Sequence, residues 1–264
     1  MPAKPRGPEH NNRRGVNEME ERDRVLDAPE IKRLAARYWD ERAPVFDDGP
    51  QHVSQSDEET AEWKGILGRL LPAPGPLSVL DVGTGTGFLA FLLAEMGHQV
   101  TGVDLSGQML AQARGKAGQL RLNVAFQEAD AEDTGFPDDA FDLVVSRHLI
   151  WNLPRPEAAI REWARIAKPG GAVAVINGIF GGNKDRPNRW EPPYRAAFER
   201  LPLAEGVPPE TLAALMNEQG LSDTRFEWLN ALAEVKRHTL PEGHQATYAP
   251  NRRYVVVGRK PRAG

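Results

Sequence analysis

Apolar residues recur along the first part of the chain with helical spacing. From Ile31 to Trp39 they return at steps of three and four residues, which predicts an amphipathic helix beginning at about Glu30. A second helix is predicted over residues 58–71, and the PAPGP stretch that follows ends it. Residues 1–29 are polar and contain prolines but no apolar period, so we expect them to form a flexible leader.

The pattern changes at Leu77, where short apolar runs begin to alternate with helical segments. Short, almost entirely apolar strands that alternate with helices are typical of a parallel sheet with helices on both faces. Strands are expected at residues 78–82, 99–103, 123–127, 141–146 and 172–177, and helices at 88–96, 108–114 and 156–167, the last ended by KPGG.

The alternation stops after Gly178. Helices are expected at residues 194–200 and 209–219, and strands at 224–228 and 253–257. These strands come too late for another full α/β unit, so the second is predicted to lie at an edge of the sheet.

The chain is therefore expected to divide into three parts. The flexible leader over 1–29 is followed by a helical lid over 30–72 and an α/β core over 73–264. Within the core, the irregular segment at about 180–222 is interpreted as a cap inserted after the fifth strand.

The composition narrows the possible partners. Of the 264 residues 40% are hydrophobic and 27% are charged, and no apolar run is long enough for a membrane span, so no membrane partner is expected. A formal net charge of −4 argues against a nucleic-acid partner. The first residues lack an apolar signal stretch, so the cytoplasm is expected. Without cysteine, and with no histidine cluster at ligand spacing, no disulfide or metal site is predicted.

A glycine-rich turn follows the first predicted strand, in VLDVGTGTGF. Gly83, Gly85 and Gly87 lack the Cβ that would keep a ligand away from the backbone N–H groups. The pattern is one residue shorter than the dinucleotide fingerprint, and Asp81, still on the strand, would repel a pyrophosphate. Asp81 can instead help to hold a cationic amino-acid group, directly or through water.

Acidic residues also follow the next two strands. Asp104 ends the second strand, where its carboxylate can accept both hydrogen bonds of a ribose diol. Asp130 and Ala131 follow the third, where a carboxylate and a backbone N–H can read the amine and a ring nitrogen of adenine. Ligands of open α/β sheets bind outside the carboxyl ends of the strands, so a nucleoside site is predicted there. Taken alone, the glycine pattern is as often only a tight turn, and an acidic residue at a strand end is more often a helix N-cap or a solvated charge. It is their joint order and spacing that favour the nucleoside site.

Two stretches, VLDVGTGTGFLAFLLAEMGHQVTGVDLSGQMLAQAR and FDLVVSRHLIWNLPRPEAAIREWARIAKPGG, resemble the class I S-adenosylmethionine-dependent methyltransferases of the group often labelled type 11. The resemblance is close over about residues 77–177. It implies a Rossmann-like seven-stranded sheet, mostly parallel with an antiparallel last strand, and S-adenosylmethionine as the cofactor. By motif match it implies contacts from Asp81, Gly83, Gly85 and Gly87 at the methionine end, Asp104 at the ribose, and Leu105, Met109, Asp130 and Ala131 at the adenine.

The segment RYWDERAPVFD resembles one that folds over the cofactor in many of these enzymes, which implies that Tyr38 or Trp39 contacts the cofactor. For Trp39, core packing on an amphipathic helix is the favoured interpretation. Arg147, where the fourth strand ends, can pair with the cofactor carboxylate or form a surface salt bridge.

Methyl transfer from a sulfonium needs an acceptor positioned in a dry pocket but no covalent nucleophile. Where the acceptor loses a proton, His148 or His52 is a candidate base, although a lone histidine is more often an ordinary polar residue. The expected function is methyl transfer to N, O or C of a small-molecule metabolite. A cyclase or isomerase that binds the same cofactor is one alternative. A nicotinamide oxidoreductase is another, against which the short glycine motif and a missing Tyr-x-x-x-Lys pair argue.

Overall fold

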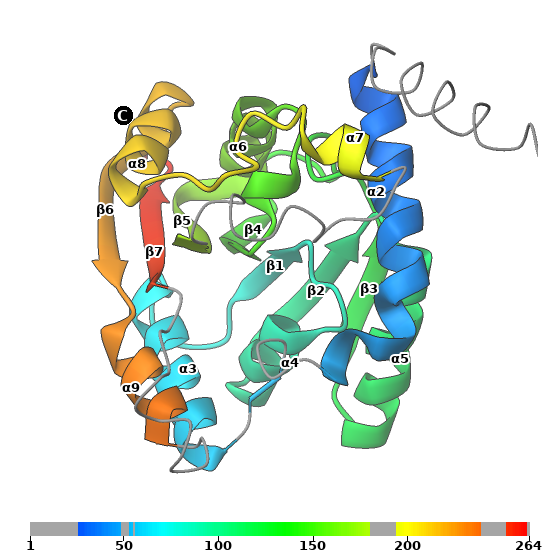
Figure 1. Ribbon diagram of the computed structural model, residues 1–264. Coiled ribbons are helices and arrows are strands. Elements are labelled where there is room, and N and C mark those ends of the chain that lie inside the picture. The colour runs from blue at the N-terminus through cyan, green and yellow to red at the C-terminus, as the bar shows by residue number, and fades with distance from the viewer. Residues whose placement is uncertain (1–25, 49–52, 55, 180–193, 239–251, 263–264) are drawn as a thin grey trace, which may run out of the picture.

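A seven-stranded sheet forms the centre of the molecule (Figure 1). The computed structural model describes residues 26–48, 53–54, 56–179, 194–238 and 252–262. The sheet order is β3-β2-β1-β4-β5-β7-β6. The strands are β1 (Ser78–Val82), β2 (Gln99–Asp104), β3 (Val124–Glu128), β4 (Phe141–Arg147), β5 (Ala167–Ile179), β6 (Ser222–Trp228) and β7 (Arg252–Arg259).

Strand directions confirm the predicted Rossmann-like sheet. The neighbours among β1 to β5 pair in parallel, whereas β7 is antiparallel to both β5 and β6. The prediction of an edge strand at 253–257 is wrong, because β7 lies between β5 and β6 and the more polar β6 forms the edge. An apolar run with a partner on each side is the expected composition of such an interior strand.

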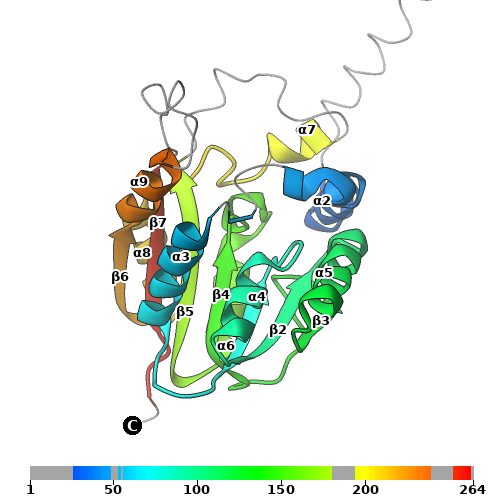
Figure 2. The ribbon, with the colours of Figure 1, turned by 90° about the horizontal axis from the view of Figure 1, so that it is seen from below.

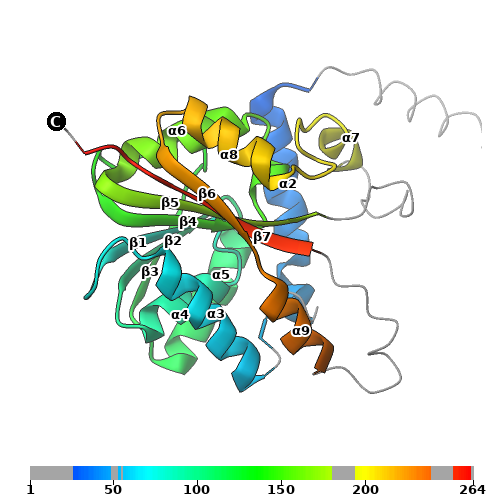
Figure 3. The same ribbon diagram turned by 90° about the vertical axis from the view of Figure 1, so that its left-hand side faces the viewer.

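Helices cover both faces of the sheet, as predicted, and Figure 3 shows the two layers above and below it. Leu80 of β1 packs with Trp163 in one buried cluster, while the neighbouring Val79 packs with Trp63 in the other, because successive strand residues face opposite sides. The helices are α2 (Ala28–Arg42), α3 (Asp57–Leu70), α4 (Phe88–Glu95), α5 (Gly107–Leu120), α6 (Pro156–Ile166), α7 (Tyr194–Phe198), α8 (Pro209–Glu218) and α9 (Asn230–His238), with 3-10 turns η1 (Ala43–Asp48) and η2 (Ile150–Asn152).

Local differences from the predicted elements have identifiable causes. KPGG does not end a helix in a loop, because β5 already begins at Ala167 and includes it. Gly170 has a φ of +80°, and a Cβ on Gly171 would lie 2.8 Å from the Lys168 carbonyl oxygen, so only glycines allow this strand to continue. Helix α9 was not predicted. None of the helices in the described ranges is long and apolar enough to cross a lipid bilayer.

Helix α2 lies outside both layers, across the carboxyl edge of the sheet. In Figure 1 the arrowhead of β2 points towards α2, drawn in blue, and Figure 2 shows α7 beside α2. Ile31 and Tyr38 of α2 share a buried cluster with Tyr194 and Phe198 of α7. The N-cap of α2 is Asp27, whose carboxylate accepts a hydrogen bond from the backbone of Glu30. A helix therefore stands where parallel strands place their ligands.

Candidate functional site

A cavity of about 200 Å³ opens between the carboxyl ends of the strands and α2. It brings together residues that the sequence spreads over more than a hundred positions. Those predicted residues that line it are Asp81, Gly83, Gly85, Asp104, Leu105, Met109, Asp130, Ala131, Arg147 and His148. Among the described residues, the lining includes Trp39 but neither Tyr38 nor Gly87. His52 lies outside the described residues.

The glycine-rich turn closes one end of the cavity. Gly83, Gly85 and Gly87 all have positive φ, between +55° and +94°, which residues with a Cβ rarely adopt. A Cβ on Gly83 would lie 2.8 Å from the side chain of Leu149, and one on Gly87 would lie 2.5 Å from the ring of Phe91. A Cβ on Gly85 would lie 3.9 Å from its nearest neighbouring atom. Neighbouring side chains therefore crowd two of the glycines, while Gly85 leaves open space.

Asp104, at the end of β2, is held by the backbone beside this turn. Its two carboxylate oxygens accept hydrogen bonds from the N–H groups of Gly85 and Ser106, each at 2.9 Å. Burial raises the pKa of Asp104, and these backbone hydrogen bonds lower it in part. Because each oxygen has more than one acceptor direction, the carboxylate keeps acceptor capacity towards the cavity.

A buried aspartate and a half-buried arginine line the same end. Burial raises the pKa of Asp81 to about 6, although the Thr84 hydroxyl donates to its carboxylate at 2.7 Å. Burial, together with repulsion from Arg253, lowers the pKa of Arg147 to about 9. The Arg147 guanidinium lies 4.3 Å from the centroid of the Phe88 ring. Both groups are thus held in surroundings that weaken their charged forms.

The loop after β3 forms the opposite end. One carboxylate oxygen of Asp130 accepts from the backbone N–H of Glu132 at 2.9 Å, and the other lies 2.6 Å from Nζ of Lys32. Lys32 comes from α2 and also contacts the Glu132 carboxylate at 2.5 Å. The sequence analysis missed Lys32, because no local pattern relates it to residues about a hundred positions away.

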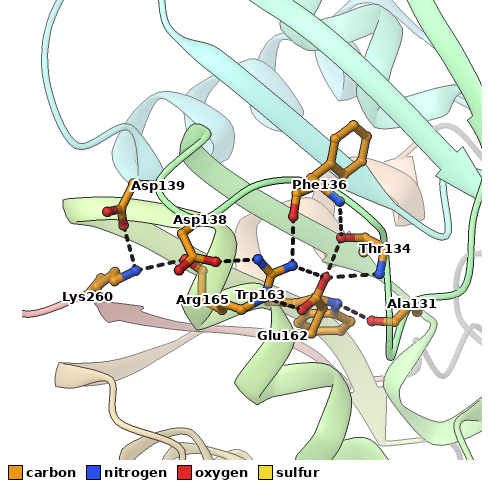
Figure 4. Close-up of polar contacts among 9 residues, drawn as sticks. All are labelled: Ala131, Thr134, Phe136, Asp138, Asp139, Glu162, Trp163, Arg165 and Lys260. Carbon is orange, nitrogen blue, oxygen red and sulfur yellow. Dashed lines mark hydrogen bonds and ion pairs between the residues drawn. The ribbon is translucent and has the colours of Figure 1, made fainter.

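Side chains of α6 hold this loop by polar contacts (Figure 4). The indole N–H of Trp163 donates to the Ala131 carbonyl at 2.9 Å. One carboxylate oxygen of Glu162 accepts from both the backbone N–H and the hydroxyl of Thr134, and the guanidinium of Arg165 donates to the same carboxylate. These contacts fix the backbone that carries Asp130.

The segment from α2 to η1 also contacts the loops that follow β2 and β1 in the cavity wall. The Asp40 carboxylate accepts from the hydroxyl of Ser106 at 2.6 Å and from the backbone of Gln108 at 3.0 Å. The Asp47 carboxylate accepts from the hydroxyl of Thr86, within the glycine-rich turn, at 2.7 Å. Together with Lys32, these contacts connect this segment to the loops that follow β1, β2 and β3.

Aromatic side chains line the remaining part of the cavity. The Trp151 ring lies 6.5 Å from that of Trp39 and 5.8 Å from that of Phe198, in edge-to-face arrangements. His148 has a φ of +58°, and its backbone N–H donates to the Ile176 carbonyl at 2.9 Å.

Tyr38 and its neighbour Trp39 differ in their placement. The ring of Tyr38 stacks on that of Tyr194 at 4.3 Å, in the cluster between α2 and α7. Trp39 is the residue of this pair that lines the cavity, where its ring also meets that of Phe46 at 6.0 Å.

Comparisons with known proteins bear on this arrangement. A family model described as a methyltransferase domain matches residues 80–175. The demethylmenaquinone methyltransferase of Thermus thermophilus is 36% identical, over 63% of this chain and 84% of that protein. The chain spans only 49% to 64% of the length of several other curated relatives that it matches.

Solved structures of low sequence identity share the fold. The (4+2)-cyclase SpnF superposes with a TM-score of 0.63 at 22% identity, over 87% of this chain and 96% of that chain. Phosphoethanolamine N-methyltransferase 2 of Haemonchus contortus, solved with S-adenosyl-L-methionine, gives 0.58 at 21% identity, over 76% and 53%. At this identity the likeness extends to the architecture alone.

Proposed function

Because the chain belongs to the class I S-adenosylmethionine-dependent methyltransferases, we propose that it transfers a methyl group from this cofactor to N, O or C of a small-molecule metabolite. The observation that carries the proposal is that Asp81, Asp104 and Asp130 line one cavity. They stand on or just after the neighbouring strands β1, β2 and β3, which is the order of a methionine tail, a ribose and an adenine.

The cavity suits the chemistry of this cofactor. At one end, Asp81 and Arg147 offer opposite charges to the ammonium and carboxylate of an amino acid, beside the open backbone at Gly85. In the middle, Asp104 accepts from the ribose hydroxyls. At the far end, Asp130 accepts from the adenine amine.

Hydrophobic and backbone groups complete the proposed nucleoside site. Leu105 and the fully buried Met109 would pack on the adenine, and the N–H of Ala131 would donate to the ring. Gly83 and Gly87 shape the turn from behind. The segment at 30–72 serves as a lid, in which Trp39 contacts the ligand more directly than Tyr38.

The aromatic part of the cavity is the proposed acceptor site. Trp39, Trp151 and Phe198 favour an acceptor with an apolar or planar portion, because they bury such surface and exclude water. Phe198 belongs to the proposed cap at about 180–222, of which residues 180–193 lie outside the described part of the chain.

We propose the cytoplasm as the location of the protein. We propose a small molecule as its partner, and neither a nucleic acid nor a membrane.

The bound cofactor supplies an electrophilic methyl group, and the chain's own residues position the acceptor and manage its proton. Holding the acceptor atom in line with the methyl group in a water-poor pocket accounts for most of the expected acceleration. His148 at the cavity wall is the proposed base for an acceptor that loses a proton, with His52 of the lid as the second candidate.

Transfer of a labelled methyl group tests this proposal. The full chain is incubated with methyl-labelled S-adenosylmethionine and a panel of acceptors that includes quinols and amines, the classes suggested by the names of two relatives. Labelled product together with S-adenosylhomocysteine supports the proposal. Conversion of a substrate with the cofactor unconsumed would instead support a cyclase, as the resemblance to SpnF allows. Failure to bind S-adenosylhomocysteine would contradict both functions.

A further inference from the structure

Lys32 makes two ionic contacts between the lid and the cavity wall. Its side chain is 12% exposed, and Nζ lies between two carboxylates, 2.6 Å from Asp130 and 2.5 Å from Glu132. Lys32 also lines the cavity itself. It is therefore a partly buried cation at the adenine end of the proposed nucleoside site.

The two carboxylates that Lys32 joins are not equally free to move. The Glu132 side chain is fully buried and accepts from the backbone N–H and Nε of Arg155, at 2.9 and 2.8 Å. Asp130 is 30% exposed and has one hydrogen bond from backbone besides Lys32. Without the ammonium, repulsion between the carboxylates would displace the less restrained one, which is Asp130.

Lys32 can hold Asp130 without displacing a ligand from it. An ionised carboxylate has about four acceptor positions. The backbone N–H of Glu132 uses one of those of Asp130, and Lys32 uses another. An amine in the cavity can therefore bond to the same carboxylate while Lys32 keeps it in place.

We propose that Lys32 is a positioning residue for adenine recognition, acting through the carboxylate of Asp130. The inference rests on the proposed cofactor site and adds to it a residue of the lid. It implies that lid docking and selection of a 6-amino purine are linked, because one side chain serves both.

The test compares two ligands with four proteins by calorimetry. The ligands are S-adenosylhomocysteine and the analogue in which hydrogen replaces the 6-amino group, which cannot donate to Asp130. The proteins are the wild type, Lys32→Met, Lys32→Arg and Arg37→Met. Arg37 is the matched control, because it removes a cation from the same helix where the partner, Glu41, is exposed and remote from the cavity lining. Thermal melting establishes that each variant is folded.

Lys32→Met is expected to weaken binding of S-adenosylhomocysteine about tenfold and that of the 6-hydrogen analogue less than about twofold. Lys32→Arg should restore most of the difference between the ligands, and Arg37→Met should leave both affinities unchanged. Equal losses for the two ligands would overturn the inference, because they indicate a structural role alone. Unchanged or tighter binding of S-adenosylhomocysteine would also overturn it, since Lys32 would then compete with the adenine. A wild type that binds neither ligand would contradict the proposed function itself.

Discussion

The two ends of the cavity differ in how their charges are balanced. At the adenine end, the protein supplies the partners: Lys32 contacts Asp130 and Glu132, and Arg155 contacts Glu132 from the other side. At the proposed methionine end, Asp81 is buried and Arg147 half-buried; they attract each other, but desolvation is the larger effect and shifts the pKa of each towards the uncharged form.

This difference indicates what each end can gain from a ligand. The proposed adenine end has its charges paired within the protein, so we expect it to contribute mainly selection among bases. At the methionine end, an ammonium beside Asp81 and a carboxylate beside Arg147 would stabilise two charges that the fold itself disfavours. We therefore expect the amino-acid tail to contribute more binding energy than the adenine edge.

The largest effect is expected at Asp104, which lies between the two ends. Asp104→Ala removes the acceptor proposed for the ribose and the carboxylate that binds the N–H groups of Gly85 and Ser106. Affinity for S-adenosylhomocysteine should fall by a factor of ten or more, measured by calorimetry. Asp57→Ala, an equal change of charge at an exposed position of α3, is the control. An unchanged affinity of Asp104→Ala would exclude the ribose assignment.

Asp81→Asn should change affinity and stability in opposite directions. It removes the charge proposed to meet the ammonium, so S-adenosylhomocysteine should bind several-fold more weakly. It also removes a buried charge whose pKa is raised from 3.8 to about 6. Without ligand, the free energy of unfolding at pH 8 should therefore rise, by about 3 kcal/mol.

The pH dependence of that gain follows from the direction of the pKa shift. In the wild type, the folded state binds more protons at Asp81 than the unfolded state does between the two pKa values, 3.8 and about 6. Stability is therefore lost as pH rises through about 6 and recovered as pH falls towards 4. Chemical denaturation of both proteins at pH 8 and pH 5 should show that Asp81→Asn raises the free energy of unfolding less at pH 5 than at pH 8. An advantage independent of pH would contradict the burial of a charged Asp81.

A smaller effect separates packing from backbone conformation in the glycine-rich turn. Gly87 and Gly97 lie at opposite ends of α4 with φ of +94° and +89°, but only a Cβ on Gly87 would meet another side chain, at 2.5 Å from Phe91. Gly97→Ala should reduce the free energy of unfolding by about 1 kcal/mol, and Gly87→Ala by about twice as much. Equal losses in chemical denaturation would show that Phe91 yields without cost.

The smallest effect is expected from salt. The ion pairs of Lys32 are partly buried and are screened less than surface pairs, so raising ionic strength should weaken S-adenosylhomocysteine binding only about twofold. The same titration of Lys32→Met should show a weaker dependence. A stronger salt dependence of binding in Lys32→Met than in the wild type would show that contacts other than those of Lys32 are sensitive to salt.

The sequence was sufficient for the parts of the cavity that depend on strand ends. Asp81, Asp104 and Asp130 stand at or just after apolar runs, and parallel strands bring their carboxyl ends to one edge, so local pattern fixes their neighbourhood. The glycine spacing likewise predicted an unusual turn, which the positive φ of all three glycines confirms.

The attachment of the lid could not be predicted in the same way. Lys32, Asp40 and Asp47 are charged residues of an amphipathic segment, and charge alone does not distinguish a solvated side chain from one that reaches another element. Whether Tyr38 or Trp39 faces the cavity depends on the position of α7. Tyr194 of α7 stacks on the ring of Tyr38, so that ring does not face the cavity. The order of the last two strands was also missed, because it depends on pairing across the sheet.

The claim that the amino-acid tail binds between Asp81 and Arg147 is tested most directly by counting protons released on binding. S-Adenosylhomocysteine is titrated into the wild type and Asp81→Asn at pH 6, in two buffers of different ionisation enthalpy. With a pKa of about 6 in the free protein, Asp81 is half protonated there and should ionise beside the ammonium, releasing about half a proton. The account predicts this release in the wild type and none in Asp81→Asn. No release in the wild type, or an equal release in both proteins, would contradict it.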